Sequence, residues 1–263
     1  MRAVSYEFTD GAARITLSAG DRGNPLNQAM VTELFSAVRR ARADDARVVL
    51  LRSEGKIFSV GGDVRGFAAA EDREQFVDDL AESLHRIVSD LHRMDAVVVS
   101  VVQGMAAGAG VPIAAAADVV LAAESARFTL AYTKLGYSPD GGSTLLTASL
   151  GLHRALHLAL LNPVLSAAQA QAAGLVAEVH PDEELDAAAE RVVAQLLAGS
   201  RTAQVAAKRL LRETATPSAE GALRRETLSV RTAAASPDGV EGVDAFLAKR
   251  PAVFPSTRGR ADT

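Results

Sequence analysis

The chain contains no cysteine and no tryptophan among its 263 residues, and aromatic residues make up only 4% of it. The missing cysteines exclude disulfide bonds, thiolate nucleophiles and zinc sites with thiolate ligands. With so few aromatics, alanine, valine and leucine must form the core, which suits close packing of helices on helices and on sheets. A chain of this length can bury a substantial core, either as one large domain or as a main domain with a small appendage.

Two other absences concern partners and location. The formal net charge of -4 argues against a nucleic-acid-binding surface, and the basic residues of the C-terminal third alternate with glutamates on expected helices. The first residues contain no apolar signal core, and we expect a cytoplasmic protein. Residues 96–117 carry no charge, but Gly104 and Pro112 interrupt them, so a buried strand, turn and helix are favoured over a membrane span.

Nucleotide-binding loops are also missing, because neither a Walker motif nor a complete G-x-G-x-x-G fingerprint occurs. Two glycine-bearing segments are present instead, FSVGGD at 58–63 and GMAAGAG at 104–110. Each follows an apolar β-rich stretch and leads into an expected helix, where free backbone N–H groups face outward. Two such turns could converge on one oxygen and form an oxyanion hole, although tight packing alone explains most turns of this kind.

The pattern around these turns predicts an α/β protein. Strands are expected at 13–17, 48–52, 96–102 and 118–122, and helices at 27–43 (with Asn27 as N-cap) and 72–94. Strands that alternate with helices indicate parallel crossovers. After residue 142 the pattern is almost wholly helical, with a late strand candidate at 177–180 and helices expected at 143–149, 152–160, 167–173, 182–197, 202–214, 219–234 and 240–249.

The two turns and their order resemble the enoyl-CoA hydratase/isomerase (crotonase) superfamily over nearly the whole chain. The segments that carry the resemblance are 21–27, 54–63, 103–110 followed by 117–119, and 246–254. The resemblance implies a crotonase (ClpP-like) fold of stacked β-β-α units with a helical C-terminal region that drives assembly into a trimer or a dimer of trimers. We expect residues 1–200 to form the core for acyl-CoA binding and catalysis, and residues 201–263 to form the helical region.

The implied ligand is an acyl-CoA thioester, with coenzyme A as part of the substrate and neither a separate cofactor nor a metal. Its carbonyl oxygen would accept hydrogen bonds from the N–H groups of Gly62 and Ala109, at the positions of the family's two donors. The adenine and phosphates would lie near 24–26 and 56–59, with Lys249 as a phosphate contact from a neighbouring subunit. The substrate-binding residues so implied are Asn24, Pro25, Leu26, Lys56, Phe58, Ser59, Gly61, Asp63, Gly108, Tyr132, Pro139 and Lys249.

Departures from the family pattern indicate the reaction. Hydratases of this family use two glutamates, and Pro112 and Tyr132 occupy the matching positions here. Asp140 is the remaining acidic candidate. Its P-D-G setting is typical of a turn or N-cap aspartate, but its position matches the catalytic aspartate of dienoyl-CoA, 3-enoyl-CoA and epoxyphenylacetyl-CoA isomerases. One carboxylate can remove a proton from one carbon and return it to another while the oxyanion hole holds the enolate.

Other candidates are weaker. His85 and His92 lie seven residues apart on one expected helix and are interpreted as structural or surface residues. His153 and His157 have the spacing of a helical metal site but no third ligand. Tyr132 could donate a hydrogen bond near the acyl group or pack under the loop. Ser143 is interpreted as a cap because no histidine is positioned to activate it.

The sequence thus predicts an acyl-CoA isomerase that shifts a double bond or rearranges a ring through Asp140. One alternative within the same fold is a hydratase, hydrolase or lyase in which water or substrate replaces the missing glutamates. Another, from a different class, is a catalytically weak acyl-CoA-binding protein, and solvent exchange at the acyl carbons would separate it from an enzyme. The acyl group is not specified, although residues 69–94 and 132–139 are expected to shape its pocket.

Overall fold

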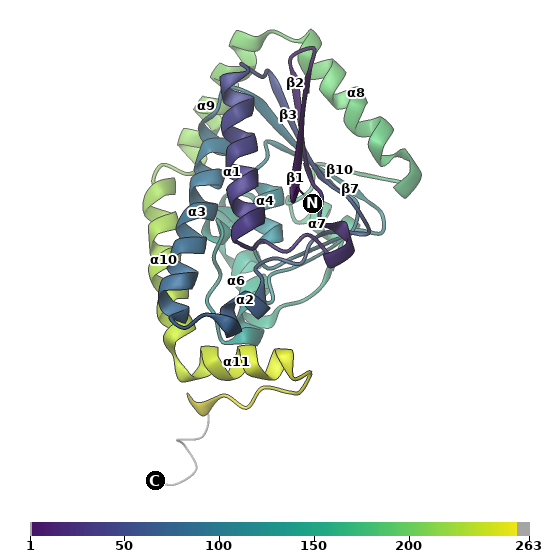
Figure 1. Cartoon of the computed structure of the whole chain (residues 1–263). Coiled ribbons are helices and arrows are strands. Elements are labelled where there is room, and N and C mark those ends of the chain that lie inside the picture. The colour runs from purple at the N-terminus through teal and green to yellow at the C-terminus, as the bar shows by residue number, and fades with distance from the viewer. Residues whose placement is uncertain (1, 257–263) are drawn as a thin grey trace.

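Six strands form a large sheet that helices cover on both faces (Figure 1). The computed structural model describes residues 2–256. The first two strands form an antiparallel hairpin, and every other neighbouring pair is parallel. In spatial order the strands are β1 (Val4–Thr9), β2 (Ala12–Leu17), β3 (Val48–Ser53), β5 (Val97–Val102), β7 (Val119–Ala123) and β10 (Glu178–His180).

A second sheet of four short strands is built largely by a unit that occurs three times along the chain: a large-sheet strand, a small-sheet strand and a helix. Each of β3, β5 and β7 is followed, within a few residues, by a three-residue strand of the small sheet. A helix or a 3-10 helix then comes next: α2 (Val64–Ala69), α4 (Gly110–Ala115) and η2 (Tyr132–Leu135). The small sheet runs β4 (Ile57–Ser59), β6 (Met105–Ala107), β8 (Arg127–Thr129) and β9 (Leu165–Ser166). Both glycine turns therefore occupy the same place in consecutive units, between a small-sheet strand and its helix.

Alternating residues of the large sheet enter two separate cores. On β3, Val49 and Leu51 belong to the core beneath α1 (Gln28–Ala43) and α3 (Arg73–Arg93). Val48 and Leu50 belong to the core beneath α8 (Leu185–Ala198). Burial on both faces explains why these strands read as continuous apolar runs.

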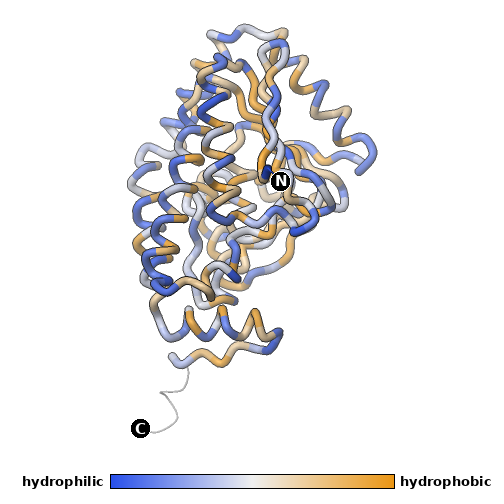
Figure 2. The backbone as a smooth tube through the Cα atoms, in the orientation of Figure 1, coloured by the Kyte–Doolittle hydropathy of each residue, from blue (hydrophilic) through white to orange (hydrophobic). Residues whose placement is uncertain are grey.

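The remaining C-terminal helices cover one side and one end of the molecule. Helix α10 (Ala219–Ala235) packs along α3, and α11 (Pro237–Leu247) lies across the end of the molecule near α2 (Figure 1). In Figure 2 the colour of these helices changes between hydrophilic and hydrophobic within their turns, as expected for amphipathic helices. The other elements are η1 (Gly20–Arg22), η3 (Ser143–Leu146), α5 (Thr147–Leu150), α6 (Leu152–Leu161), α7 (Ala167–Ala172), η4 (Asp182–Glu184) and α9 (Arg201–Ala215).

Most of the predicted elements are confirmed, and the differences have local causes. The side chain of Asn27 accepts the Met30 N–H and caps α1, as expected. The late strand is present as β10, because it pairs with β7 at the sheet edge. The small sheet was not predicted, since three-residue strands give no periodic signal. The last helix begins at Pro237 rather than near 240, because Ser236 caps it and proline suits its first turn.

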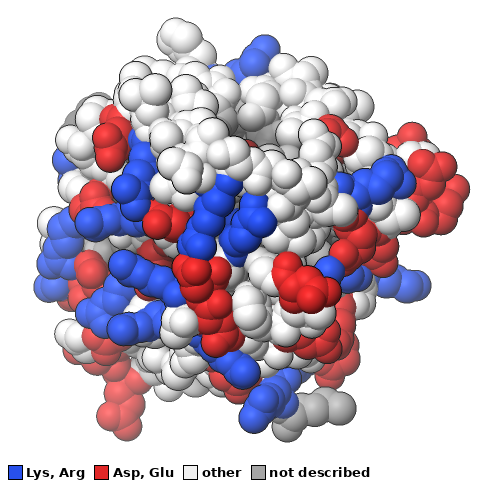
Figure 3. Space-filling model, turned by 90° about the horizontal axis from the view of Figure 1, so that it is seen from above, with Lys and Arg blue, Asp and Glu red and all other residues white. Residues whose placement is uncertain are grey.

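The uncharged stretch 96–117 forms β5, β6 and α4, as expected for a buried strand, turn and helix. Within residues 2–256, no helix is long and apolar enough to cross a membrane. On the face shown in Figure 3, basic and acidic side chains are intermingled.

A buried ion cluster attaches α9 to the sheet. The Lys208 ammonium donates to the carbonyls of Leu91 and Ala96 and lies 2.8 Å from an Asp118 carboxylate oxygen. Arg212 donates to the other Asp118 oxygen. Burial comes first among the influences on Lys208 and lowers its pKa, which Asp118 partly offsets.

We expect Lys208→Met to destabilise the fold by about 3 kcal/mol, because it leaves two buried carbonyls and one oxygen of a half-buried carboxylate without this donor. Urea unfolding followed by circular dichroism measures the change. The control is Arg209→Met on the same helix, which removes an exposed pair with Asp95 and should change stability little. Equal stability of the Lys208 variant and wild type would contradict this account of the cluster.

Candidate active site

The two glycine turns are in backbone contact with each other. Gly61 has a φ of +83°, and a Cβ there would lie 2.6 Å from the Ala107 carbonyl oxygen and 3.1 Å from the Ala109 nitrogen. Only glycine fits this conformation and this approach without strain. Pairing of β4 with β6 brings the turns together.

Both turns leave an amide N–H without a protein acceptor. Among the described residues, neither the Gly62 N–H nor the Ala109 N–H donates a hydrogen bond to the protein. Gly62 forms an isolated parallel β-bridge with Leu26. In this bridge the Gly61 carbonyl accepts the Leu26 N–H at 2.8 Å, and the Gly62 N–H takes no part. The two free donors are therefore available to a ligand oxygen, which is the requirement for an oxyanion hole.

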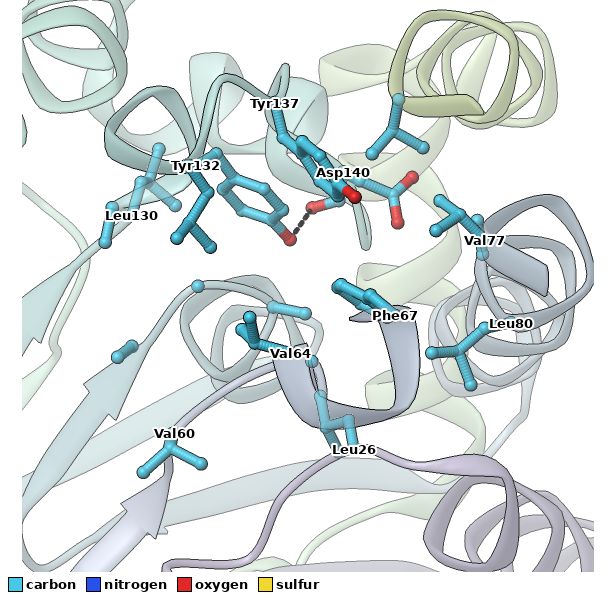
Figure 4. A pocket seen from close by; sticks show the side chains of 18 of the residues that line it. Leu26, Val60, Val64, Phe67, Val77, Leu80, Leu130, Tyr132, Tyr137 and Asp140 are labelled. Carbon is cyan, nitrogen blue, oxygen red and sulfur yellow. Dashed lines mark hydrogen bonds between the residues drawn. The ribbon is translucent and has the colours of Figure 1, made fainter. Parts of the chain in front are cut away.

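A cavity of about 320 Å³ opens beside the two turns. Apolar side chains from α2, α3 and the loop after β8 form most of its wall (Figure 4). Phe67 and Tyr137 stack across part of it, with ring centroids 5.9 Å apart. The lining residues include Leu26, Val60, Gly62, Val64, Phe67, Val77, Leu80, Leu84, Gly108, Ala109, Leu130, Tyr132, Lys134, Tyr137, Asp140, Val230 and Phe246. Residues 69–94 and 132–139, which are expected to shape the acyl pocket, both contribute to this lining.

Asp140 is the one carboxylate among the lining residues that the structure describes, and it is only 7% exposed. Its backbone carbonyl accepts hydrogen bonds from the Tyr132 hydroxyl at 2.9 Å (Figure 4) and the Ser143 hydroxyl at 2.6 Å. The following Gly141, at φ +73°, lies so close to Ala109 that a Cβ would be 3.1 Å from the Ala109 side chain. The loop that carries Asp140 is thus packed directly onto the second glycine turn.

Asp140 does not act as a helix cap, because Glu226 of α10 performs that task. One Glu226 oxygen accepts the N–H groups of Gly142 (2.8 Å) and Ser143 (3.2 Å), and the other accepts the N–H of Thr144 (2.7 Å) and its hydroxyl. The free donors at the start of η3 are satisfied by a residue more than eighty positions away. The side chain of Asp140 is left for the cavity.

His85 of α3 lies behind Asp140. Its Nε2 is 2.9 Å from an Asp140 carboxylate oxygen and 3.5 Å from a Glu226 oxygen. Burial by itself lowers the pKa of His85, but contacts with Asp140 and Glu226 outweigh it and raise that pKa to about 9. Of the two expected roles, the surface role does not apply to His85, because it is buried beside the cavity residue Asp140.

Sequence reasoning missed both His85 and Glu226 as site residues. Helical spacing does place His85 next to Leu84 and Val88 on the buried face of α3, where a titratable residue is unusual. Glu226 gave no comparable signal, because its role depends on how α10 docks on α3.

The side chains of three predicted ligand contacts are engaged within the fold, and contact of these residues with the CoA stays a prediction. The Asn24 side chain accepts from Ala19 N–H and donates to the Glu54 and Ile57 carbonyls. Ser59 donates to the Asn24 carbonyl, and Phe58 is fully buried in the core. These side chains hold the first turn in place and do not face the cavity.

The other predicted contacts lie around the turns. Lys56 and Lys249 are exposed and do not line the cavity, and a phosphate contact for them stays a prediction. The Asp63 side chain accepts the Arg65 N–H at the start of α2. Pro25 is buried and Pro139 half-buried, beside the lining residues Leu26 and Asp140 respectively.

The two positions at which hydratases carry glutamate now have structural explanations. Pro112 of α4 is buried and packs under the loop that carries Asp140. A Cβ added at Gly141 of that loop would lie 3.4 Å from the Pro112 Cγ. Tyr132 lines the cavity, but its hydroxyl is committed to the Asp140 carbonyl. Burial raises the pKa of Tyr132 well above its usual value, so it is not a proton acceptor.

His85, Asp140 and Glu226 are also the one group of three within residues 2–256 whose ligand atoms lie close enough to hold a metal ion. The donors on Glu226 argue against that use, because its two oxygens already accept four hydrogen bonds. The raised pKa of His85 also favours a protonated ring, which cannot ligate a metal. The arrangement is better suited to proton transfer.

Comparison with known proteins agrees with this geometry. The family model described as enoyl-CoA hydratase/isomerase matches residues 7–257. The chain belongs to the enoyl-CoA hydratase/isomerase family. Its two sheets and surrounding helices are those of the crotonase fold, as predicted, because a crystal structure of an enoyl-CoA hydratase from Mycobacterium avium subsp. paratuberculosis K-10 superposes with a TM-score of 0.88 at 35% identity, covering 96% of this chain and 98% of that one.

Curated relatives of this family member include both reaction types. A probable enoyl-CoA hydratase of Rhodobacter capsulatus is 35% identical over 95% of this chain and 97% of its own length. The 1,2-epoxyphenylacetyl-CoA isomerase of Escherichia coli is also 35% identical, over 97% of this chain and 98% of its own length. Overall similarity therefore does not separate isomerase from hydratase, and the distinction depends on the site.

We expect Gly61→Ala to weaken binding of a saturated acyl-CoA by about tenfold, because the new Cβ meets the Ala107 carbonyl and pushes the two N–H donors apart. Isothermal titration with hexanoyl-CoA measures the affinity. Gly66→Ala in α2 is the matched control, since a Cβ there makes an ordinary 3.4 Å contact. Unchanged affinity in the Gly61 variant would show that the paired turns do not hold the thioester.

Proposed function

We propose that this family member is an acyl-CoA isomerase, in which Asp140 moves a proton between two carbons of a CoA thioester. The observation that carries the proposal is the single cavity carboxylate beside two unpaired backbone N–H groups. The N–H groups of Gly62 and Ala109 would donate hydrogen bonds to the thioester oxygen, and the acyl chain would extend along the apolar wall. A double-bond shift or an epoxyphenylacetyl-CoA-type rearrangement needs no cofactor beyond the coenzyme A of the substrate.

The reaction follows from these groups. Asp140 removes a proton from the carbon next to the carbonyl, and negative charge moves onto the thioester oxygen. The two N–H groups stabilise that charge more strongly than the neutral carbonyl, which lowers the barrier. Asp140, now protonated, returns a proton to a carbon further along the chain. Apolar walls slow but do not prevent exchange of the carboxyl proton with water, so part of the product carries solvent hydrogen.

The site disfavours the hydratase alternative in its two-glutamate form. Addition of water needs one group to activate the water and another to protonate the α carbon. Pro112 cannot do either, and the Tyr132 hydroxyl is hydrogen-bonded to a backbone carbonyl. A lyase or hydrolase that uses Asp140 alone is the remaining variant within this fold.

The buried carboxylate of Asp140 argues against the binding-protein alternative. A pure binder needs the N–H pair and the cavity but has no use for a buried carboxylate in an apolar wall, where desolvation is unfavourable. Retention of Asp140 at 7% exposure therefore favours an enzyme.

We expect the wild-type protein in heavy water to convert 3-hexenoyl-CoA to the 2-enoyl isomer, with deuterium entering at the α or γ carbon. Asp140→Asn should lower the rate by at least ~10²-fold, because the amide cannot accept the proton. Proton NMR follows both events. Full activity of the variant would show that Asp140 is only a loop residue, whereas an inactive wild type would exclude alkenoyl isomerisation of this substrate and favour a ring substrate or a binder.

We also propose that the chain assembles as a trimer or a dimer of trimers. Helix α6 supports this, because its leucines at i, i+4 and i+8 are unusually exposed: Leu152 (60%), Leu156 (44%) and Leu160 (63%). A stripe of this kind on an amphipathic helix suits burial against another copy.

We expect light scattering of the wild-type protein to give three or six times the 27.4 kDa of one chain. Leu156→Glu with Leu160→Glu should shift the protein toward monomer, because it places charges on the apolar stripe. Glu183→Lys in the exposed η4 is the control and should leave the mass unchanged. A wild-type mass of one chain would contradict the proposed assembly.

A further inference from the structure

We infer that His85 is a positioning residue whose imidazolium holds the Asp140 carboxylate charged and directed into the acyl cavity. The inference rests on the proposed role of Asp140 as the base. His85 itself does not line the cavity, so it acts through Asp140 and does not touch the substrate.

Three residues, two from α10 and one from the loop before η3, fix the ring of His85. Thr227 of α10 contacts its Nδ1 through the hydroxyl at 3.0 Å, and Thr227 is fully buried. Its Nε2 lies 2.9 Å from Asp140 and 3.5 Å from Glu226. The ring is 4% exposed, so the imidazole has no access to bulk water that could replace these contacts.

The contact with Asp140 is an ion pair without an aligned hydrogen bond. The two atoms are 2.9 Å apart, yet neither Nε2 nor that Asp140 oxygen has a hydrogen bond of good geometry to any described residue. A charged ring is attracted to both carboxylates regardless of the exact N–H direction. A neutral ring would leave two buried polar atoms with almost no compensation.

The charged groups around His85 favour its protonated form. Asp140 faces it from the loop after η2, Glu226 from α10, and Glu82 from one turn earlier on α3. The nearby cation Arg224 of α10 pairs with Glu82. Contacts with Asp140 and Glu226 raise the pKa of His85 to about 9 despite its burial, so the ring is protonated at neutral pH.

Removal of a substrate proton requires an ionised base, and the His85 imidazolium is the cation that lies 2.9 Å from the Asp140 carboxylate. Glu226 is stabilised by four donors of its own and stays in place during the reaction. When Asp140 takes the substrate proton, the cluster loses one negative charge and the enolate oxygen gains it. No proton needs to leave His85 at any step.

The first test does not depend on activity. Protein labelled with 15N-histidine has five imidazoles to observe, and His85→Gln assigns the relevant signal. We expect both ring nitrogens of His85 to carry protons at pH 7.5, with a midpoint near 9, and Asp140→Asn to lower that midpoint. His92 is an internal reference, because burial and then Arg212 lower its pKa to about 3. A neutral His85 ring at pH 7.5 would overturn the inference.

The second test separates positioning from a structural role. In His85→Gln, the acidic limb of kcat/KM should move to higher pH by about one to three units, the effect expected when an opposite charge is lost beside a base. KM should change little, because His85 does not line the cavity. A decrease in kcat/KM by the same factor at every pH, or an unchanged pH profile of kcat/KM, would contradict the inference. His92→Gln on the same helix is the matched control and should keep the wild-type profile.

These tests distinguish the two proposals. If the wild type moves no proton in any thioester, the proposed isomerase function fails, and the NMR titration still decides the charge on His85. If isomerisation depends on Asp140 but the ring is neutral, the function stands and the role of His85 is wrong.

Discussion

Pairing of the short strands β4 and β6 places two glycine turns against each other, and the whole site is arranged around that backbone contact. The approach is too close for any side chain at Gly61. It leaves the Gly62 and Ala109 N–H groups without protein acceptors. Because these donors belong to the main chain, they need no ordering at the moment of reaction. The remaining chemistry then requires only a proton carrier at the correct distance.

The carboxylates of Glu226 and Asp140 have different roles at the loop that packs on the turns. Glu226 satisfies the N–H groups at the start of η3, which a turn aspartate would ordinarily do. The Asp140 side chain is thereby kept out of the local hydrogen bonding and left to face the cavity beside His85. The C-terminal helix α10 supplies Glu226 and Thr227, and also Val230 of the cavity wall. Docking of α10 on α3 therefore contributes to the site as well as to stability.

The parts of this arrangement that repeat along the chain could be predicted from sequence. Apolar runs bounded by glycine identified the large-sheet strands and the two turns, and Asn27 marked the start of α1. Contacts between distant elements could not be predicted in this way. Asn24 reads as a loop residue near a ligand, but its side chain is consumed by three hydrogen bonds within the fold. His85 and Glu226 are 141 positions apart in sequence, and only the packing of two helices brings them to Asp140.

The most direct test of the account is a crystal structure of the Asp140→Asn variant with 3-hexenoyl-CoA bound. The account predicts that the thioester oxygen lies at about 3 Å from both the Gly62 and Ala109 nitrogens. It also predicts the α carbon within about 3.5 Å of the residue-140 side chain, and the acyl tail along Phe67 and Leu80. A thioester oxygen bound elsewhere, or an acyl chain that leaves residue 140 out of reach of its α and γ carbons, would contradict it.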